Sequence, residues 1–135
     1  MTCRIITIDG PAGAGKTTVS RLLAKKLGCV RVDTGALYRA VAFEIQRQAV
    51  SWKNDAALDA FLSRLDLNVV LEKEEMRVLS SGRDITPFIR TPEISMLASA
   101  TSARPAVRSA LLDIQRRIGQ QQDAVFEGRD MGTVV

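Results

Sequence analysis

Histidine is absent from this sequence of 135 residues, and cysteine occurs only twice, as Cys3 and Cys29. The two cysteines lie far apart, and no histidine is present to complete the ligand spacing of a metal site. We therefore expect both thiols to be small buried groups in a reducing compartment, with no disulfide between them.

Aromatic residues and long apolar runs are also scarce. Only 4% of the residues are aromatic, so little is available to stack nucleic-acid bases along a binding surface. No apolar run is long enough to span a membrane, and the N-terminus lacks the zones of a signal peptide. We therefore expect a cytoplasmic protein that binds neither nucleic acid nor a membrane.

The composition is typical of a folded protein. Apolar residues make up 46% of the chain and charged residues 25%, which favours one domain, or one small domain carrying an insert. The net charge of +4 favours anionic partners such as phosphates and nucleotides, although it also fits an ordinary basic surface.

The first fifty residues alternate between strand and helix patterns. Residues 4–9, RIITID, and residues 30–33 are short apolar runs typical of buried strands. Residues 16–27 carry apolar residues at helical spacing and end at Gly28. A second helix face is formed by Leu37, Val41 and Ile45. This alternation predicts a parallel sheet with helices on its faces.

The middle of the chain has a different pattern. Residues 67–74 and 76–86 predict an antiparallel hairpin, and Thr91 with Pro92 predicts the start of a helix that runs through Ser99. Two more helices have apolar faces, one at Leu58, Phe61, Leu62 and Leu65, and one, starting near Pro105 and ending at Gly119, at Val107, Leu111, Ile114 and Ile118. We therefore expect core structure in residues 1–50, an insert in 51–122, and a return to a core strand in 123–135.

A phosphate-binding loop follows the first predicted strand. Residues 10–17, GPAGAGKT, match the pattern G-x-x-x-x-G-K-[ST] in full, between a strand and a helix. Its glycines let successive amide N–H groups point at phosphate oxygens, and the helix start adds positive charge. The expected ATP-binding residues are Gly10, Pro11, Ala12, Gly13, Ala14, Gly15, Lys16, Thr17 and Thr18. Lys16 would reach the β- and γ-phosphates, and the Thr17 hydroxyl would bind Mg²⁺.

Five further segments carry a more specific resemblance. They are IDGPAGAGKTT, DTGALYRAV, SGRDIT with IRTPEIS, RPAVRSALLDIQR, and EGRDMGTVV. Together they resemble bacterial cytidylate kinases, which transfer phosphate from ATP to CMP or dCMP. The resemblance covers essentially the whole chain. It implies an α/β fold of the P-loop, nucleoside monophosphate kinase type, in which 51–122 is the inserted α+β region that binds the monophosphate.

The resemblance also implies roles for the acceptor side. Arg39 and Arg129 would hold the monophosphate, because the guanidinium fork suits phosphate oxygens, and with Lys16 they form the expected catalytic set. Asp33 and Tyr38 would shape the acceptor pocket. The cytosine edge would be read by Ser99, Arg108 and Asp130.

These base contacts would discriminate cytosine from uracil. Asp130 would accept from the cytosine amino group, and Arg108 would donate to the ring acceptors. Uracil reverses two of these pairings, because its O4 would face the carboxylate and its N3–H would face the guanidinium. Each buried group left unpaired costs about 1–3 kcal/mol.

Simpler interpretations exist for several of these residues. Judged from the residues alone, Arg39 and Arg108 could be solvated surface charges and Ser99 an ordinary helix serine. Asp33, Arg129 and Asp130 instead lie at strand ends, where α/β folds place ligands. Glu127 departs from the family, which usually has aspartate there, so its contacts to the acceptor or to the metal's waters could shift.

The end of the chain raises a further expectation. In the resembling family the sequence continues past Val135 with more core strands, an arginine-bearing lid and part of the adenine site. A transition-state arginine can contribute a factor of about 10³–10⁵, so a chain without the lid should be a poor catalyst. One edge of the first strand should also be open, which favours self-association or poor solubility, unless the 135 residues are part of a longer product.

Two other functions stay open from the sequence. One is a nucleotide-binding protein that holds CMP or ATP without turnover. The other is a P-loop kinase for a different small acceptor, such as adenylate or shikimate, which the DTGALYR and EGRDMGTVV segments do not favour.

Overall fold

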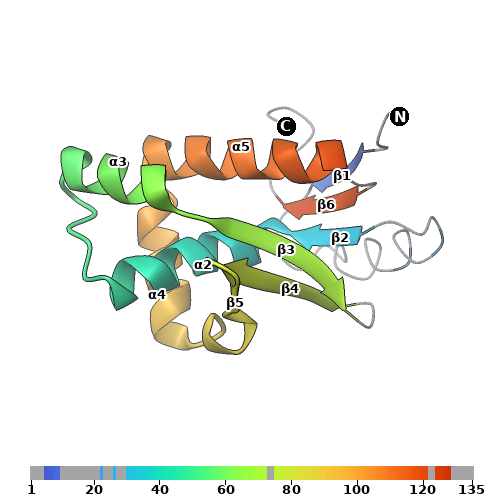
Figure 1. The fold of residues 1–135 in the computed structure, drawn as a ribbon, viewed down its shortest axis with the longest axis horizontal. Helices are drawn as coiled ribbons and strands as arrows, with labels where there is room; N and C mark the ends of the chain where they lie inside the picture. Colours follow the sequence, from blue (N-terminus) through green and yellow to red (C-terminus); the bar gives the residue numbers. More distant parts are fainter. Residues whose placement is uncertain are drawn as a thin grey trace.

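The computed structural model describes residues 5–9, 22, 26, 30–72, 75–121 and 124–128. Its elements are, in chain order, β1 (Ile5–Asp9), β2 (Val30–Asp33), α2 (Thr34–Arg47), α3 (Asp55–Arg64), β3 (Leu67–Glu72), β4 (Glu75–Ser80), β5 (Arg83–Asp84), the 3₁₀ helix η1 (Thr86–Phe88), α4 (Pro92–Thr101), α5 (Pro105–Gln121) and β6 (Ala124–Gly128) (Figure 1). The mixture of helices and strands expected from the sequence is confirmed. Residues 22 and 26 are helical, and the rest of the helix predicted for 16–27 lies outside the described residues.

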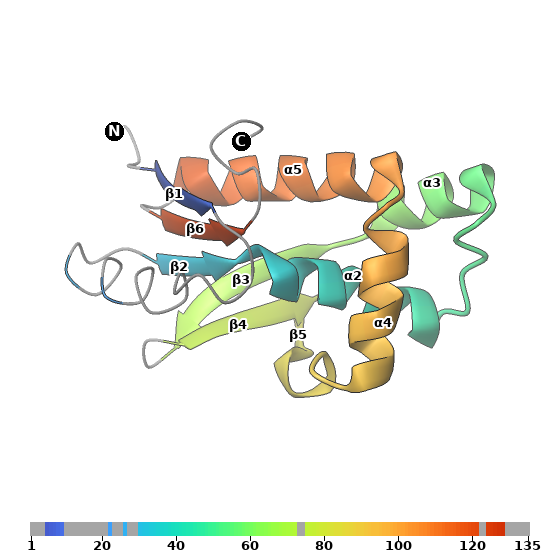
Figure 2. The same ribbon diagram turned by 180° about the vertical axis from the view of Figure 1, so that it is seen from behind.

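The first sheet has the strand order β1-β6-β2, and both pairings are parallel. The last described strand of the chain therefore lies between the first two (Figure 2). Its register pairs Asp9 with Gly128 and Asp33 with Glu127. The carboxyl ends of all three strands thus meet at one edge of the sheet, the edge at which α/β folds bind ligands.

The outer edge of β1 has no strand partner among the described residues. Self-association through this edge is not tested by the pairing and stays a prediction.

The second sheet is the predicted hairpin with one short addition. The strand order is β3-β4-β5, and both pairings are antiparallel. The run predicted as one strand, 76–86, is interrupted at Ser81 and Gly82, whose φ angles are 50° and 81°. Such left-handed backbone turns the chain, so β4 ends at Ser80 and the two-residue β5 folds back onto it.

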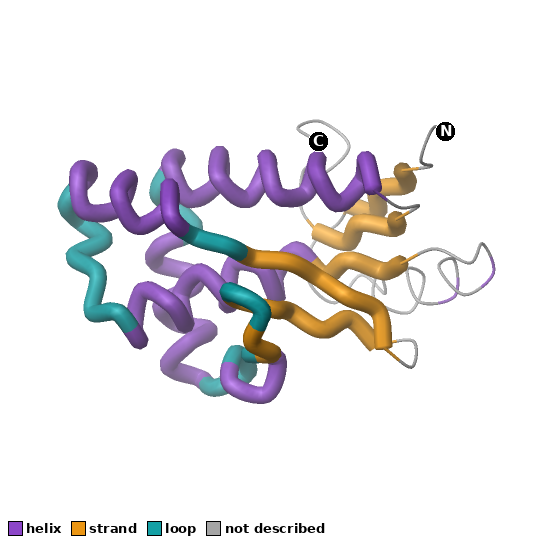
Figure 3. Tube along the Cα trace, in the orientation of Figure 1, coloured by secondary structure: helices purple, strands orange, loops and turns teal. Residues whose placement is uncertain are grey.

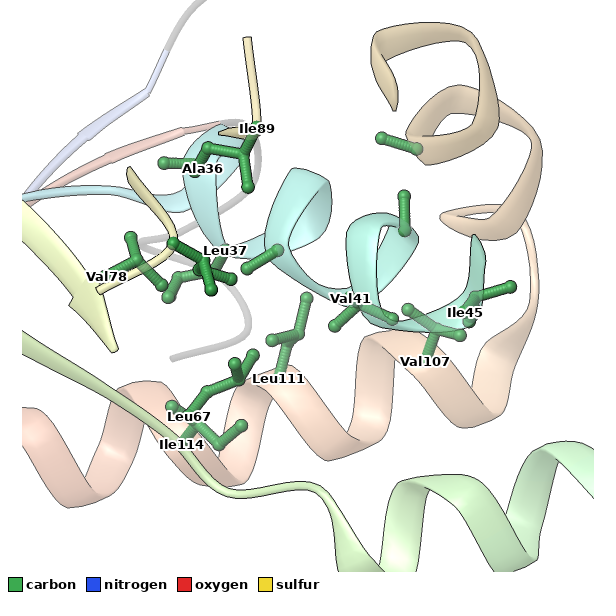
Figure 4. Close-up of a cluster of buried hydrophobic side chains, with 14 of the residues drawn as sticks. Ala36, Leu37, Val41, Ile45, Leu67, Val78, Ile89, Val107, Leu111 and Ile114 are labelled. Carbon is green, nitrogen blue, oxygen red and sulfur yellow. The ribbon is translucent and has the colours of Figure 1, made fainter. Parts of the chain in front are cut away.

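One hydrophobic core joins the two sheets and the helices around them. In Figure 4 the α2 side chains of Leu37 and Val41 lie among residues from the hairpin and from α5. The fully buried members include Val32, Leu37, Val41, Phe61, Leu67, Val78, Val107 and Leu111. This cluster crosses residue 51, so the segment predicted as an insert and the segment before it are packed into the same core.

Helix α5 runs along one side of the molecule, beside α3 and past β3 (Figures 1 and 3). All four residues of its predicted apolar face are buried, as expected. Its predicted end is wrong: the helix continues through Gly119 to Gln121. Glycine costs a helix interior only about 1 kcal/mol relative to alanine, and burial of the adjacent Ile118, which is 3% exposed, offsets that cost.

Helix α4 packs across α2. The predicted cap is confirmed, because the Thr91 hydroxyl accepts a hydrogen bond from the Ile94 amide at 3.2 Å. The helix ends at Thr101, two residues later than predicted from the sequence. In the part of the chain that the structure describes, none of the helices combines the length and the apolar character needed to cross a membrane.

Candidate functional site

The junction of β2 and α2 forms the described part of the candidate site. Asp33 is the last residue of β2 and also the N-cap of α2, with extended backbone at φ −85° and ψ 105°. Its Oδ1 accepts a hydrogen bond from the Gly35 amide at 2.9 Å. An aspartate suits both positions because its short side chain can turn back to an amide of the first helical turn.

The second carboxylate oxygen of Asp33 faces an arginine on the same helix. Arg39 Nη2 lies 3.7 Å from Asp33 Oδ2, and the two side chains are 26% and 36% exposed. This is an ion pair, but its length exceeds that of a hydrogen bond. A guanidinium has five N–H donors, so one carboxylate at this distance leaves capacity to bind a second anion.

Tyr38 lies next to this pair in sequence, but packing determines its position. Its side chain is half-buried and contacts the edge of the hydrophobic core. The structure therefore holds Tyr38 in a defined place, whereas its predicted role in an acceptor pocket stays a prediction.

Ser99 and Arg108, the two predicted base-reading residues on helices, are both exposed. Ser99 lies near the end of α4 and Arg108 in the first turns of α5, and residues 102–104 connect the two helices. Among the described residues, no hydrogen bond or ion pair joins either side chain to Asp33 or Arg39. The structure therefore brings two members of the predicted acceptor set into contact and leaves these two apart.

The remaining predicted residues lie outside the described residues. They are Gly10, Pro11, Ala12, Gly13, Ala14, Gly15, Lys16, Thr17, Thr18, Arg129 and Asp130. Glu127 is described only as a position in β6, paired with Asp33 of β2.

A buried carboxylate further along α2 was not identified from the sequence. Glu44 is 3% exposed, and its Oε2 accepts from Arg47 Nε at 3.0 Å, Arg47 Nη2 at 2.7 Å and Gln48 Nε2 at 2.8 Å. Burial acts to raise the pKa of Glu44, but hydrogen bonds from Arg47, Gln48 and Ser80 outweigh it and lower the pKa below its ordinary value. The only sequence signal for this contact is the i, i+3 spacing of Glu44 and Arg47.

The Glu44 contacts attach α2 to its neighbours. The Gln48 side chain, which donates to Glu44, accepts a hydrogen bond from Arg64 of α3 at 3.1 Å. Ser80, whose side chain contributes to the lowered pKa of Glu44, is the last residue of β4. The second half of α2 is therefore attached both to α3 and to β4.

A second cluster of oppositely charged side chains lies at the turn between β4 and β5. Asp84 accepts from the Thr86 amide at 2.9 Å and lies 3.9 Å from Arg77. Hydrogen bonds from the Thr86 side chain and backbone lower the pKa of Asp84, with a smaller contribution from Arg77. The Thr86 hydroxyl in turn accepts from the Val78 amide at 2.8 Å. In these contacts Asp84 organises the turn between β4 and β5.

Within the described ranges, no three side chains of histidine, cysteine, aspartate or glutamate gather in the way that a metal ion would need. The predicted Mg²⁺ ligand, Thr17, lies outside those ranges.

Comparison with known proteins places the chain among nucleotide kinases. The family model "Cytidylate kinase" matches residues 6–135. A cytidylate kinase from Geobacter sp. (strain M21) is 47% identical over 131 residues, which are 97% of this chain and 56% of the relative. A cytidylate kinase from Geobacter sulfurreducens is 46% identical over the same shares of both chains.

A bifunctional pantoate ligase/cytidylate kinase from Synechococcus elongatus is 44% identical over 136 residues, with 26% of the relative covered. The chain spans about half the length of the cytidylate kinases that it matches.

Proposed function

Because the chain belongs to the cytidylate kinase family, whose fold is that of the P-loop nucleoside monophosphate kinases, we propose that it transfers the γ-phosphate of MgATP to CMP or dCMP. In this reaction an α-phosphate oxygen of the acceptor attacks the γ-phosphorus in line. The bond to the β–γ bridging oxygen breaks, and the products are ADP and CDP or dCDP. No general base is needed, since the attacking oxygen is already anionic.

The observation that carries this proposal is the ion pair of Asp33 and Arg39 at the end of β2. Arg39 is a permanently charged donor at the strand edge where α/β folds bind ligands. The Asp33 carboxylate restrains the guanidinium of Arg39. The carboxylate is itself held in place by the hydrogen bond that it accepts from the Gly35 amide. Arg39 is therefore suited to bind the acceptor phosphate, together with Arg129.

On the donor side, the loop from Gly10 to Thr18 would hold the triphosphate. Its backbone amides would cradle the phosphates, Lys16 would neutralise the β- and γ-phosphates, and Thr17 would offer its hydroxyl to Mg²⁺. A single protein hydroxyl suits Mg²⁺, because this ion usually keeps several waters and binds substrate phosphates; bound there, it would neutralise charge on the transferring phosphate. Asp9 directly precedes the phosphate-binding loop in the sequence and is paired with Gly128, which directly precedes Arg129. This register supports a donor loop that lies close to Arg129.

Base selection is assigned to Ser99, Arg108 and Asp130 in this proposal. The support is that α4 and α5 meet at the connection 102–104, which sets Ser99 and Arg108 at neighbouring helix ends. Asp130 follows β6, the central strand of the parallel sheet.

At the level of architecture, we propose a P-loop core in residues 1–50 and 123–135, with helices on both faces of the parallel sheet, and a monophosphate-binding region in 51–122. The continuous hydrophobic core supports a region that packs firmly on the sheet. A cytoplasmic location stays a prediction.

The proposal is tested by CMP titration and by chromatography of diphosphate products. CMP, dCMP, UMP and AMP are each offered with and without MgATP to the parent chain and to Arg39→Ala. Hydrogen bonds to charged groups contribute about 1.5–3 kcal/mol, so Arg39→Ala should bind CMP about 10- to 100-fold more weakly. A Lys16→Ala variant should keep CMP binding and lose CDP formation.

The matched control for Arg39→Ala is Arg104→Ala. Arg104 also pairs with a carboxylate, that of Asp55, and its side chain is 29% exposed against 26% for Arg39. Arg104→Ala should bind CMP as the parent does. Equal binding of UMP and CMP, or diphosphate formed from AMP rather than CMP, would contradict the proposed function.

A further inference from the structure

Gly35 occupies the space between the two charged groups of the candidate site. A Cβ atom built on Gly35 would lie 3.1 Å from Asp33 Oδ1 and 3.2 Å from Arg39 Nη1. Ordinary van der Waals contacts of a Cβ atom are 3.4–4 Å. Both groups therefore lie closer to this position than ordinary van der Waals contact with a Cβ atom allows.

Backbone conformation does not account for a glycine here. Among the described glycines, only Gly82 has a φ in the left-handed region. Gly35 lies in the first turn of α2, where alanine would favour the helix more than glycine does. The glycine is thus locally unfavourable for folding, and the space it leaves is used by Asp33 and Arg39.

The two groups would respond differently to an added methyl. The Asp33 carboxylate is tied at 2.9 Å to the amide of the substituted residue itself. The Arg39 guanidinium is the end of a long side chain, and its ion pair with Asp33, at 3.7 Å, is longer than a hydrogen bond. The guanidinium would therefore move, and a bidentate contact to phosphate depends on its orientation.

We propose that Gly35 is a positioning residue for the acceptor phosphate: its missing side chain lets the guanidinium of Arg39 lie against the first turn of α2, oriented by Asp33. The inference rests on the proposed function, in which Arg39 binds the phosphate of CMP. It adds a determinant of acceptor affinity that does not itself touch the substrate.

The test compares Gly35→Ala with Gly82→Ala in CMP titration and thermal unfolding. Gly35→Ala should bind CMP about tenfold more weakly, the loss expected for one charge-assisted hydrogen bond. Its Tm should change little, because the helix propensity gained with alanine is offset by the close contact of the new Cβ with Asp33 Oδ1. Gly82→Ala should do the opposite. Its φ of 81° strains any side chain and its Cβ would touch nothing within 4 Å, so Tm should fall while CMP affinity is unchanged.

A double-mutant cycle separates positioning from a general structural effect. In an Arg39→Ala background, Gly35→Ala should cause no further loss of CMP affinity, because the group that it displaces is gone. An equal loss in both backgrounds would overturn the inference, and so would a fall in Tm for Gly35→Ala as large as that for Gly82→Ala.

The cycle also distinguishes this inference from the function on which it rests. If the parent chain and Gly35→Ala bind CMP equally, the inference fails and the proposed function stands. If the parent chain does not bind CMP, the proposed function fails and the inference fails with it.

Discussion

Replacing Glu44 by glutamine should lower the free energy of unfolding by about 1–3 kcal/mol, the range for a buried charged group that loses hydrogen-bond partners. The Glu44 side chain is 4% exposed and accepts three hydrogen bonds through a single oxygen. Glutamine keeps the shape, but it removes the charge and offers one carbonyl oxygen in place of the carboxylate. We expect the lower part of the range, because Arg47 is 52% exposed and solvent screens its contribution.

The assay is urea unfolding at neutral pH, with Glu93→Gln as the matched control. Glu93 is exposed in the first turn of α4, so its replacement should change stability much less. CMP affinity should be the same in both variants, because Glu44 contacts Arg47, Gln48 and Ser80 rather than the candidate site. A change below about 0.5 kcal/mol for Glu44→Gln, the range of ordinary surface substitutions, would refute the reasoning.

The pH dependence gives a second check on Glu44. The pKa of Glu44 in the folded chain lies below its ordinary value of 4.5, so the unfolded chain binds the proton more readily than the folded chain. The stabilisation is therefore fully present above pH 4.5 and is lost as the pH falls through the lower folded pKa. The stability difference between parent and Glu44→Gln should shrink in acid, and a difference that grows there would contradict the assigned direction.

Two further predictions concern stability. Leu111→Ala should cost about 2–5 kcal/mol in urea unfolding, because Leu111 is fully buried. Met96→Ala, at a residue that is 74% exposed, is the control, and equal losses would mean that the side chain of Leu111 is not buried in the core. Asp33→Ala should lower the free energy of unfolding by about 1 kcal/mol, because the helix loses its cap. Asp33→Asn should stay near the parent, since an amide oxygen can still accept the Gly35 hydrogen bond. An equally large loss of stability for Asp33→Asn would show that charge, not capping, matters at this position.

Local sequence patterns were sufficient to predict helices that have a regular apolar spacing or a clear N-cap residue. The spacing of Leu37, Val41 and Ile45 predicted α2, and all three are buried. Thr91 predicted the start of α4 because a threonine before proline can cap a helix. The end of α5 was predicted wrongly because Gly119 is a frequent stop signal, while its effect inside a packed helix is small.

The same contrast holds for the candidate site, where some residues were predicted from the sequence and others were not. Asp33 was a candidate from the sequence because it lies at a strand end, whereas Arg39, on the following helix, became one only through the resemblance. The burial of Glu44 could not be predicted, because a glutamate on a helix is usually solvated and its surroundings include Ser80 of β4, far away in the sequence. Gly35 gave no signal either, since its effect depends on where two side chains point.

The sequence by itself determined the order of helices and strands, the phosphate-binding pattern and the family, because these depend on local spacing and residue identity. Only the tertiary structure decided that β6 lies between β1 and β2, so that strand ends more than a hundred residues apart share one edge. Pairing of this kind depends on the packing of the whole core and on loop closure, neither of which a local pattern records.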